Sequence, residues 1–305
     1  MNVKTDLILE IATNLKEHTK GYTLKETKTH FGFLKTTVEI LNKQGMDLFS
    51  QKKGHYITLD ATNDYINNET IKKNIARELK DCIKEMIMLT KVNSLKKVLI
   101  VGLGNKQMVS DSLGTKVVEK LIITRHIKEV IKEDAENINS ISAIAPGVLG
   151  TTGIETYHIV KGVVYEVKPD VVIIIDTLST INAKKMASSF QLTNTGIVPG
   201  GGVGNARTPI CKENLGVPVI VLGVPLVVYA YAMCQEVLET IVKEKNLENY
   251  EDDLKQIATS VLGDFIVTVK NIDEVVEECA DIISFSLNLL INPQLVTNDN
   301  KTTIK

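Results

Sequence analysis

Runs of consecutive apolar residues alternate along this chain with apolar residues at helical spacing. Residues 171–175 are five successive β-branched side chains, a pattern typical of a central strand that is buried on both faces of a sheet. Residues 97–102 and 217–222 are further apolar runs that predict strands. Between residues 71 and 89 the apolar positions recur every four residues, which predicts an amphipathic helix.

Strands and helices are expected to alternate from residue 97 to about residue 245. The expected strands are 97–102, 141–145, 171–175 and 217–222, and the expected helices are 112–130, 154–167 and 226–243. This order is typical of the α/β class, with a doubly wound, mostly parallel sheet that has helices on both faces.

The chain on either side of this core has a different pattern. Residues 36–41 and 55–59 predict a β-hairpin-like unit, and after the core we expect a polar helix over 246–259. A final helix is expected to begin after Asn271 or Asp273. We therefore divide the chain into an N-terminal extension with the hairpin (7–68), an α/β core with C-terminal helices (69–292) and a disordered tail (293–305).

The composition is that of an ordinary soluble protein. Of the 305 residues, 44% are hydrophobic and 24% charged, and the formal net charge is −2. That charge gives no field suited to nucleic acid or an acidic membrane, and the absence of tryptophan argues against a base-stacking platform. No apolar run approaches the ~20 residues of a membrane span, and the N-terminus has no signal pattern, so we expect an intracellular, cytoplasmic protein. The four cysteines lack metal-ligand spacing and are expected to be reduced and buried.

Two acidic residues follow the expected parallel strands. Asp176 comes directly after the run 171–175, and Asp111 lies in the loop that follows strand 97–102. Ligands of an open parallel sheet bind beyond the carboxyl ends of its strands, so we expect these two carboxyl groups to form one site. Two such acids could act as a dyad, one ionised as a base and one protonated as an acid. The alternative is that each carboxylate only caps the segment that follows it.

A glycine pair ends the strand 97–102. Gly102 and Gly104 suggest a dinucleotide-binding turn, but that fingerprint needs a third glycine where this chain has Gln107. We therefore predict no nucleotide cofactor.

Two glycine-rich loops lie between and after the acids. The first contains Gly147, Gly150, Gly153 and Glu155, and the second contains Gly196, Gly200, Gly204 and Asn205. Such loops could cradle a phosphate, although neither has the Lys-Ser/Thr ending of a P-loop. They could equally line a cleft for an extended peptide, or form only tight surface turns. Glu155 and His158 could join the site, but no histidine has a partner at zinc-site spacing, so we predict no metal.

Six motifs in order resemble the germination protease family of spore-forming bacteria. They are residues 101–105, 111–114, 121–126, 145–156, 175–178 and 195–205, and the similarity extends from about residue 3 to residue 290. The resemblance implies an atypical aspartic endopeptidase, related in fold to hydrogenase-maturation proteases, whose two essential aspartates fall on Asp111 and Asp176. It also implies a homotetramer that degrades small acid-soluble spore proteins in the forespore and spore core, and that needs no cofactor.

The resemblance extends to the N-terminus. Members of the family are made as zymogens that remove a short propeptide by self-processing, and residues 3–7 resemble the segment around that cut. The cut would fall between Asp6 and Leu7, leaving a propeptide of residues 1–6. The region 242–262 looks shortened relative to the family, and Ser110 and Thr115 stand where the family favours proline.

Two other classes of protein remain open from the sequence. A metal-assisted maturation-type protease would use the same sheet edge together with Glu155 or a histidine, and chelators would inactivate it. A non-catalytic binding protein would need the two acids only as caps. The sequence also leaves open which aspartate is the acid and which the base.

Overall fold

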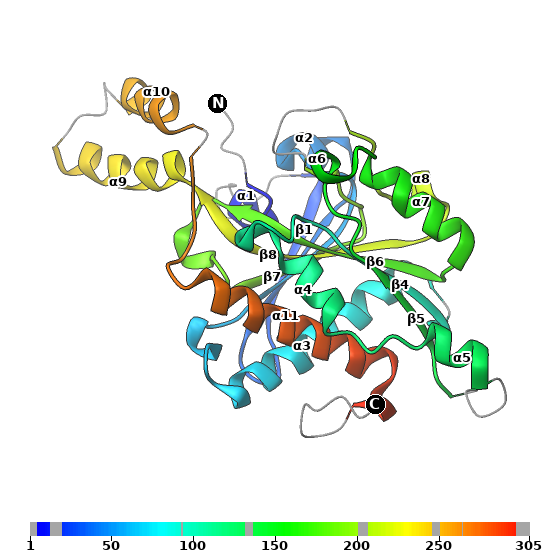
Figure 1. The fold of residues 1–305 in the computed structure, drawn as a ribbon. Coiled ribbons are helices and arrows are strands. Elements are labelled where there is room, and N and C mark those ends of the chain that lie inside the picture. The colour runs from blue at the N-terminus through cyan, green and yellow to red at the C-terminus, as the bar shows by residue number, and fades with distance from the viewer. Residues whose placement is uncertain are drawn as a thin grey trace.

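One mixed sheet runs through the molecule (Figure 1), in the strand order β1-β2-β3-β7-β8-β6-β4-β5, with β9 paired to β8. The computed structural model describes residues 5–12, 20–92, 94–131, 137–200, 207–245, 251–263 and 265–296. The strands are β1 (Tyr22–Lys28), β2 (Leu34–Ile40), β3 (Gly54–Asp60), β4 (Lys97–Gly102), β5 (Ser140–Ile144), β6 (Val171–Thr180), β7 (Ser189–Thr193), β8 (Val219–Tyr229) and β9 (Ile266–Val267). The α-helices are α1 (Ile8–Ala12), α2 (Lys43–Phe49), α3 (Glu69–Leu89), α4 (Leu113–Glu119), α5 (Arg125–Ile131), α6 (Leu149–Thr152), α7 (Thr156–Val167), α8 (Lys212–Leu215), α9 (Ala230–Lys245), α10 (Glu251–Leu262) and α11 (Ile272–Ile291).

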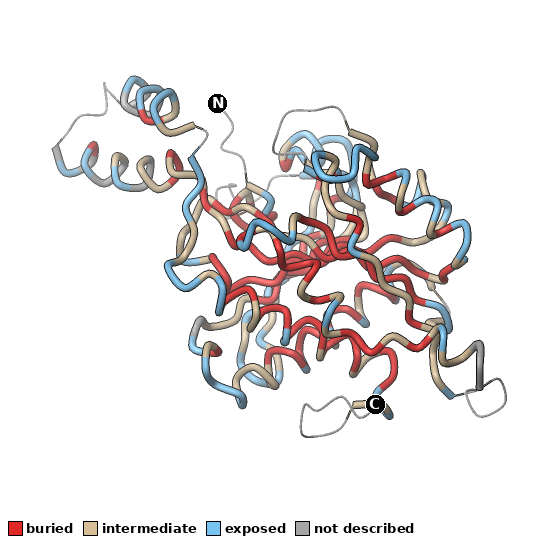
Figure 2. The backbone as a smooth tube through the Cα atoms, viewed as in Figure 1, coloured by how far each residue is buried: buried red, intermediate tan, exposed pale blue. Residues whose placement is uncertain are grey.

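Strands β5, β4, β6 and β8 form the parallel part of the sheet, which confirms the predicted α/β class. Their consecutive apolar residues are buried because alternate side chains face opposite helical layers. In β4, Val98 and Ile100 pack with α3 and α11, whereas Leu99 and Val101 pack with α7. Figure 2 shows these buried residues concentrated through the middle of the molecule.

Strand β6 is longer than the apolar run that predicted it. It stays paired with β8 as far as Thr180, but β4 ends at Gly102 opposite Ile175. Residues 176–180 of β6 therefore extend beyond the last residue of β4 that pairs with it. The candidate site forms at this end of β6.

The N-terminal extension belongs to the same sheet rather than standing apart from it. The predicted hairpin is present as β2 and β3, with α2 in the connection between them, and β3 pairs antiparallel with β7. Strands β1 and β7 were not predicted; β1 lies at the outer edge of the sheet, and four of its residues are exposed charged or polar side chains.

The predicted helix 112–130 is two helices, α4 and α5. The chain breaks between them because Ile122 donates its amide to the Asn288 side chain on α11 instead of to a helical carbonyl, at 3.0 Å. Thr124 then bonds β5 through its hydroxyl, which accepts from the Ile141 amide at 2.9 Å. The helix predicted from 226 begins at Ala230 because β8 continues to Tyr229.

The C-terminal elements follow the expected order, and residues 246–250 of the predicted polar helix lie outside the described residues. The polar helix is α10, which lies with α9 as an arm beside the main body (Figure 1), and α11 begins after Asn271. The segment assigned to a disordered tail starts with a short 3-10 helix, Pro293–Leu295, and its residues 297–305 lie outside the described residues.

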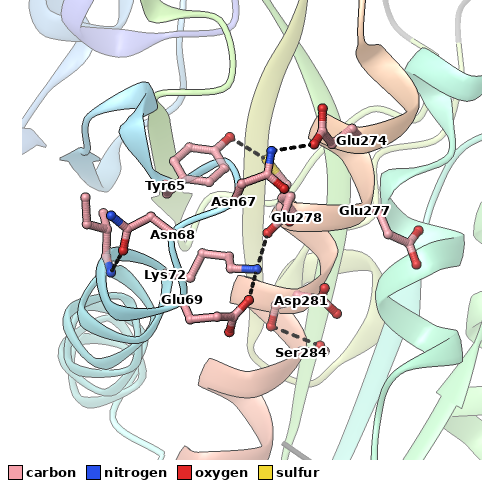
Figure 3. A network of polar contacts seen from close by, with 12 residues as sticks. Tyr65, Asn67, Asn68, Glu69, Lys72, Glu274, Glu277, Glu278, Asp281 and Ser284 are labelled. Atoms are coloured by element: carbon pink, nitrogen blue, oxygen red, sulfur yellow. Dashed lines mark hydrogen bonds and ion pairs between the residues drawn. The ribbon is translucent and has the colours of Figure 1, made fainter.

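A polar network fastens α3 to α11 (Figure 3). Lys72 of α3 pairs with Glu278 of α11 at 2.6 Å and also with Glu69, and both the Lys72 and the Glu278 side chains are less than 15% exposed. Just before α3, the hydroxyl of the fully buried Tyr65 donates to the Ala187 carbonyl at 2.8 Å. The network therefore ties the helical layer to the segment that precedes β7.

The cysteines are free thiols, as predicted, and all but Cys234 are buried. None of the helices in the described residues combines the length and the apolar character needed to span a bilayer.

Candidate active site

A cavity of about 1670 Å³ lies at the carboxyl end of the parallel strands. Asp111 and Asp176 both line it, together with Asp6 from the N-terminal segment. The two acids expected to meet at this edge of the sheet therefore share one cavity.

Asp176 is the first residue of β6 beyond the end of β4, and it is a half-buried residue that lines the cavity. Burial raises the pKa of Asp176 well above its ordinary value, and the nearby Asp111 carboxylate raises it further, with a smaller contribution from Asp6. A hydrogen bond from the Thr177 amide lowers the pKa of Asp176, but the pKa remains raised overall. A proton on this side chain is thus favoured where an ordinary aspartate would be ionised.

Asp111 ends the 3-10 helix η2 (Val109–Asp111) that follows β4. Its Oδ2 atom accepts a hydrogen bond from the amide of Asn105 at 2.9 Å. Burial raises the pKa of Asp111, but this hydrogen bond stabilises the ionised form and opposes the rise. Both carboxyl groups thus have a backbone amide that favours the ionised form, but the pKa of Asp176 is raised more strongly than that of Asp111.

Glycines allow the loop that carries Asp111 to approach α4 closely. A Cβ atom on Gly102 would lie 2.0 Å from the carbonyl oxygen of Gly114, and one on Gly104 would lie 1.9 Å from the carbonyl oxygen of Asp111. Gly104 also has a φ of +108°, which L-residues rarely adopt. The Gly-x-Gly sequence is thus explained by packing of the backbone around Asp111.

The N-terminal segment enters the same cavity. The Gln191 side chain on β7 donates through Nε2 to the main-chain carbonyl of Asp6 at 2.7 Å, and its Oε1 accepts from the amide of Ile8 at 2.7 Å. The Asp6 carboxylate accepts from both the amide and the hydroxyl of Ser179. The expected cleavage position between Asp6 and Leu7 is therefore held in the cavity that contains the two acids.

The glycine-rich loops contribute unequally. Gly147, Gly196 and Gly200 line the cavity, whereas Gly150, Gly153 and Glu155 are not among its described lining residues. Gly204 and Asn205 lie outside the described residues.

Glu155 connects the two loops instead of lining the cavity. Its carboxylate accepts from the hydroxyl of Thr208 at 3.2 Å and from the Thr208 amide at 3.4 Å. His158 lies 3.6 Å from the same carboxylate and has a largely exposed side chain. Glu155 is thus placed to fix the position of the second loop.

Among the cavity residues missed from the sequence are Ser179, Gln191 and Arg207. Arg207 donates to the Pro199 carbonyl at 3.2 Å and brings a positive charge to the cavity wall. The sequence signal for Ser179 was its position three residues after Asp176, whereas Gln191 had no local signal. Within the described ranges, no three His, Cys, Asp or Glu side chains are grouped so that they could hold a metal ion.

Comparison with known proteins shows which class of protein this chain belongs to. The family model described as germination protease matches residues 4–263, and the chain is therefore a protease. It belongs to the germination protease family. The germination protease of Caldanaerobacter subterraneus subsp. tengcongensis is 37% identical over 318 residues, covering 98% of this chain and 97% of that protein.

Other relatives agree. The germination protease of Clostridium acetobutylicum is 36% identical, with 96% of each chain covered, and that of Bacillus subtilis is 31% identical, with 98% of this chain and 95% of that protein covered. Among solved structures, the [NiFe] hydrogenase maturation protease HycI of Thermococcus kodakarensis is similar with a TM-score of 0.36 and 15% identity, over 68% of this chain and 99% of its own.

Proposed function

We propose that this protein is an aspartic-type endopeptidase that cleaves peptide bonds with Asp111 and Asp176. The observation that supports this most directly is a peptide segment in the cavity that these two acids line. The carbonyl of Asp6, the residue before the expected cut, accepts a hydrogen bond from Gln191. A donor on that carbonyl would stabilise the negative charge that develops on its oxygen during attack.

The two acids would have different roles because their surroundings differ. Asp111, with the Asn105 amide on its carboxylate, is the better candidate for the ionised base that takes a proton from water as the water oxygen attacks the carbonyl carbon. Asp176, with the more strongly raised pKa, would carry the proton that passes to the leaving amide nitrogen as the C–N bond breaks. The products are a carboxylic acid and an amine.

The biological role proposed here follows from family membership. The substrates would be small acid-soluble spore proteins, degraded when spores germinate, and the enzyme would reside in the forespore and spore core as a homotetramer. The chain would be made as a zymogen and would remove residues 1–6 itself. Sedimentation equilibrium of the purified protein measures the proposed assembly directly.

The test of the catalytic proposal is Asp176→Asn. We expect cleavage of a purified spore protein, and self-processing after Asp6, to fall by about 10²- to 10⁴-fold, since an essential acid is lost. Asp47→Asn is the matched control, because Asp47 is an exposed carboxylate that lines the same cavity from α2. Unimpaired cleavage by Asp176→Asn would remove this residue from the mechanism.

A further inference from the structure

Leu178 of β6 occupies the space that a side chain on Gly223 of β8 would fill. A Cβ atom on Gly223 would have Cγ and both Cδ atoms of Leu178 as its nearest neighbours, at 2.5–2.7 Å. Leu178 is itself paired with Pro225, so its side chain leans back along β8 by two residues. The missing side chain of Gly223 is therefore what allows Leu178 to take this position.

This position is next to Asp176. Asp176 is the residue of β6 that pairs with Gly223, and the Cβ positions of residues paired on adjacent strands lie about 5 Å apart on one face of the sheet. Residues 176 and 178 share that face, because side chains alternate along a strand. The Leu178 carbon atoms at the Gly223 position thus lie beside the Asp176 side chain, on the side that faces β8.

Leu178 is largely closed off from solvent at this point. Its side chain is apolar, and the residue is only 8% exposed although it lines the cavity. Hydrocarbon that keeps water away from a carboxyl group favours the neutral form of that group. Burial is also the largest cause of the raised pKa of Asp176. Leu178 is thus placed to supply part of that burial.

We propose that Leu178 is a positioning residue of the proposed endopeptidase: its side chain shields the Asp176 carboxyl group from water on the β8 side and so keeps Asp176 able to donate a proton. Leu178 has no group that could exchange a proton, and it acts only through Asp176. This inference rests on the proposed endopeptidase function and adds the residue that prepares its acid.

Two other carboxyl groups act on Asp176. Asp111 of η2 and Asp6 of the N-terminal segment both raise its pKa, whereas the Thr177 amide lowers it. The other ionisable side chains that line the cavity are Glu10, Asp47, Lys52, Tyr56, Arg207 and Tyr229. All of these groups are kept when Leu178 is substituted, so a shift in a Leu178 variant reports the changed hydration of Asp176.

The first test is the pH dependence of cleavage by Leu178→Ala. Water that enters the vacated space should lower the pKa of Asp176 towards its ordinary value, so that the acid loses its proton at a lower pH. With a purified spore protein as substrate, we expect the alkaline limb of the kcat profile to move to lower pH by about one unit. Leu178→Met, which keeps the hydrocarbon, should leave the limb in place. Coinciding limbs for the wild type and Leu178→Ala would overturn the inference.

A control and a rescue separate hydration from general loss of packing. Leu121→Ala is the matched control, because Leu121 is also 8% exposed but is not among the described residues that line the cavity. It should lose stability and keep the limb of the wild type. Combining Leu178→Ala with Gly223→Ala returns a methyl group to the vacated space and should move the limb back towards the wild-type pH. An equal shift in Leu121→Ala would attribute the effect to packing and refute the role of Leu178.

Unfolding in urea tests this inference without any cleavage. The wild type loses stability as pH rises from 3.8 towards the raised pKa of Asp176. In Leu178→Ala this loss should end about one pH unit lower, and Leu178→Val, a smaller truncation that serves if alanine prevents folding, should give a smaller shift. The same pH range in the wild type and the variants would refute the inference. The expected shift in a protein that cleaves nothing would refute the proposed function alone.

Discussion

Asp176 of β6 and Gln191 of β7 lie in one row across the sheet, each paired with Gly223 of the intervening strand β8. Strand spacing places their Cα atoms roughly 10 Å apart. Both side chains project from the same face, and Gly223 between them has none. An extended peptide over this row therefore has a carboxyl group on one side and a carboxamide on the other.

This relationship predicts the effect of Gln191→Glu. The glutamate keeps an oxygen for the Ile8 amide but loses the N–H that bonds the Asp6 carbonyl, so the carbonyl is no longer polarised. We expect kcat for self-processing to fall about 10²- to 10³-fold, as for loss of one oxyanion donor. Gln51→Glu, another cavity-lining glutamine, should process at the wild-type rate. If Gln51→Glu slows self-processing as much as Gln191→Glu does, the added negative charge in the cavity explains the effect and the lost hydrogen bond does not.

The raised pKa of Asp176 predicts how stability depends on pH. The folded protein keeps this proton to a higher pH than the unfolded chain does, so the free energy of unfolding falls as pH rises from the ordinary pKa of 3.8 towards the raised pKa. Asp176→Asn removes this loss, and urea unfolding should show the variant gaining stability over wild type between pH 4 and pH 7. The gain is about 1.4 kcal/mol for each pH unit that separates the folded-state pKa from the unfolded-state pKa. A constant difference across that range would contradict the assignment.

The packing of the Asp111 loop predicts the effect of Gly114→Ala. A Cβ atom there would lie 2.4 Å from the carbonyl oxygen of Leu103, a backbone atom that cannot move alone. We expect the free energy of unfolding to fall by about 3 kcal/mol, measured by chemical denaturation. In contrast, the Cβ atom of Gly162→Ala, at an exposed position of α7, meets no atom within 4 Å, and the variant should be more stable by about 0.5–1 kcal/mol.

Two ion pairs have the same N–O separation of 2.6 Å, but we expect their removal to lower the free energy of unfolding by different amounts. Lys72 and Glu278 have side chains 12% and 14% exposed, whereas Lys106 and Glu119 are 71% and 48% exposed. Lys72→Ala leaves a mostly buried carboxylate without its cation and should cost about 2–3 kcal/mol of stability. Lys106→Ala should cost less than about 1 kcal/mol in the same denaturation experiment, because water screens that pair. Similar costs would show that burial is not the deciding factor.

The parallel strands and the two acids could be predicted because their signals are local. Residues 171–175 are apolar without interruption, which fixes a strand buried on both faces, and Asp176 marks its end. The α3 helix was equally clear from its four-residue apolar spacing.

Strand β7 and Gln191 could not be predicted because their signals are not local. Residues 189–193 are only five long, and Phe190 and Leu192 alternate with polar side chains in a way that many short segments share. They form a strand because β3 and β8 offer partners on both sides. The importance of Gln191 follows from its register opposite Gly223, which the linear sequence does not contain.

The pairing of β3 with β7 joins Asp60 to Ser189, which lie 129 positions apart. During synthesis the N-terminal hairpin leaves the ribosome long before its partner exists. Until residue 193 has emerged, one edge of β3, with Ile57 and Leu59, remains open to strands of other nascent chains. The order in which the ribosome delivers these strands thus makes pairing between nascent chains a hazard in the biogenesis of this enzyme.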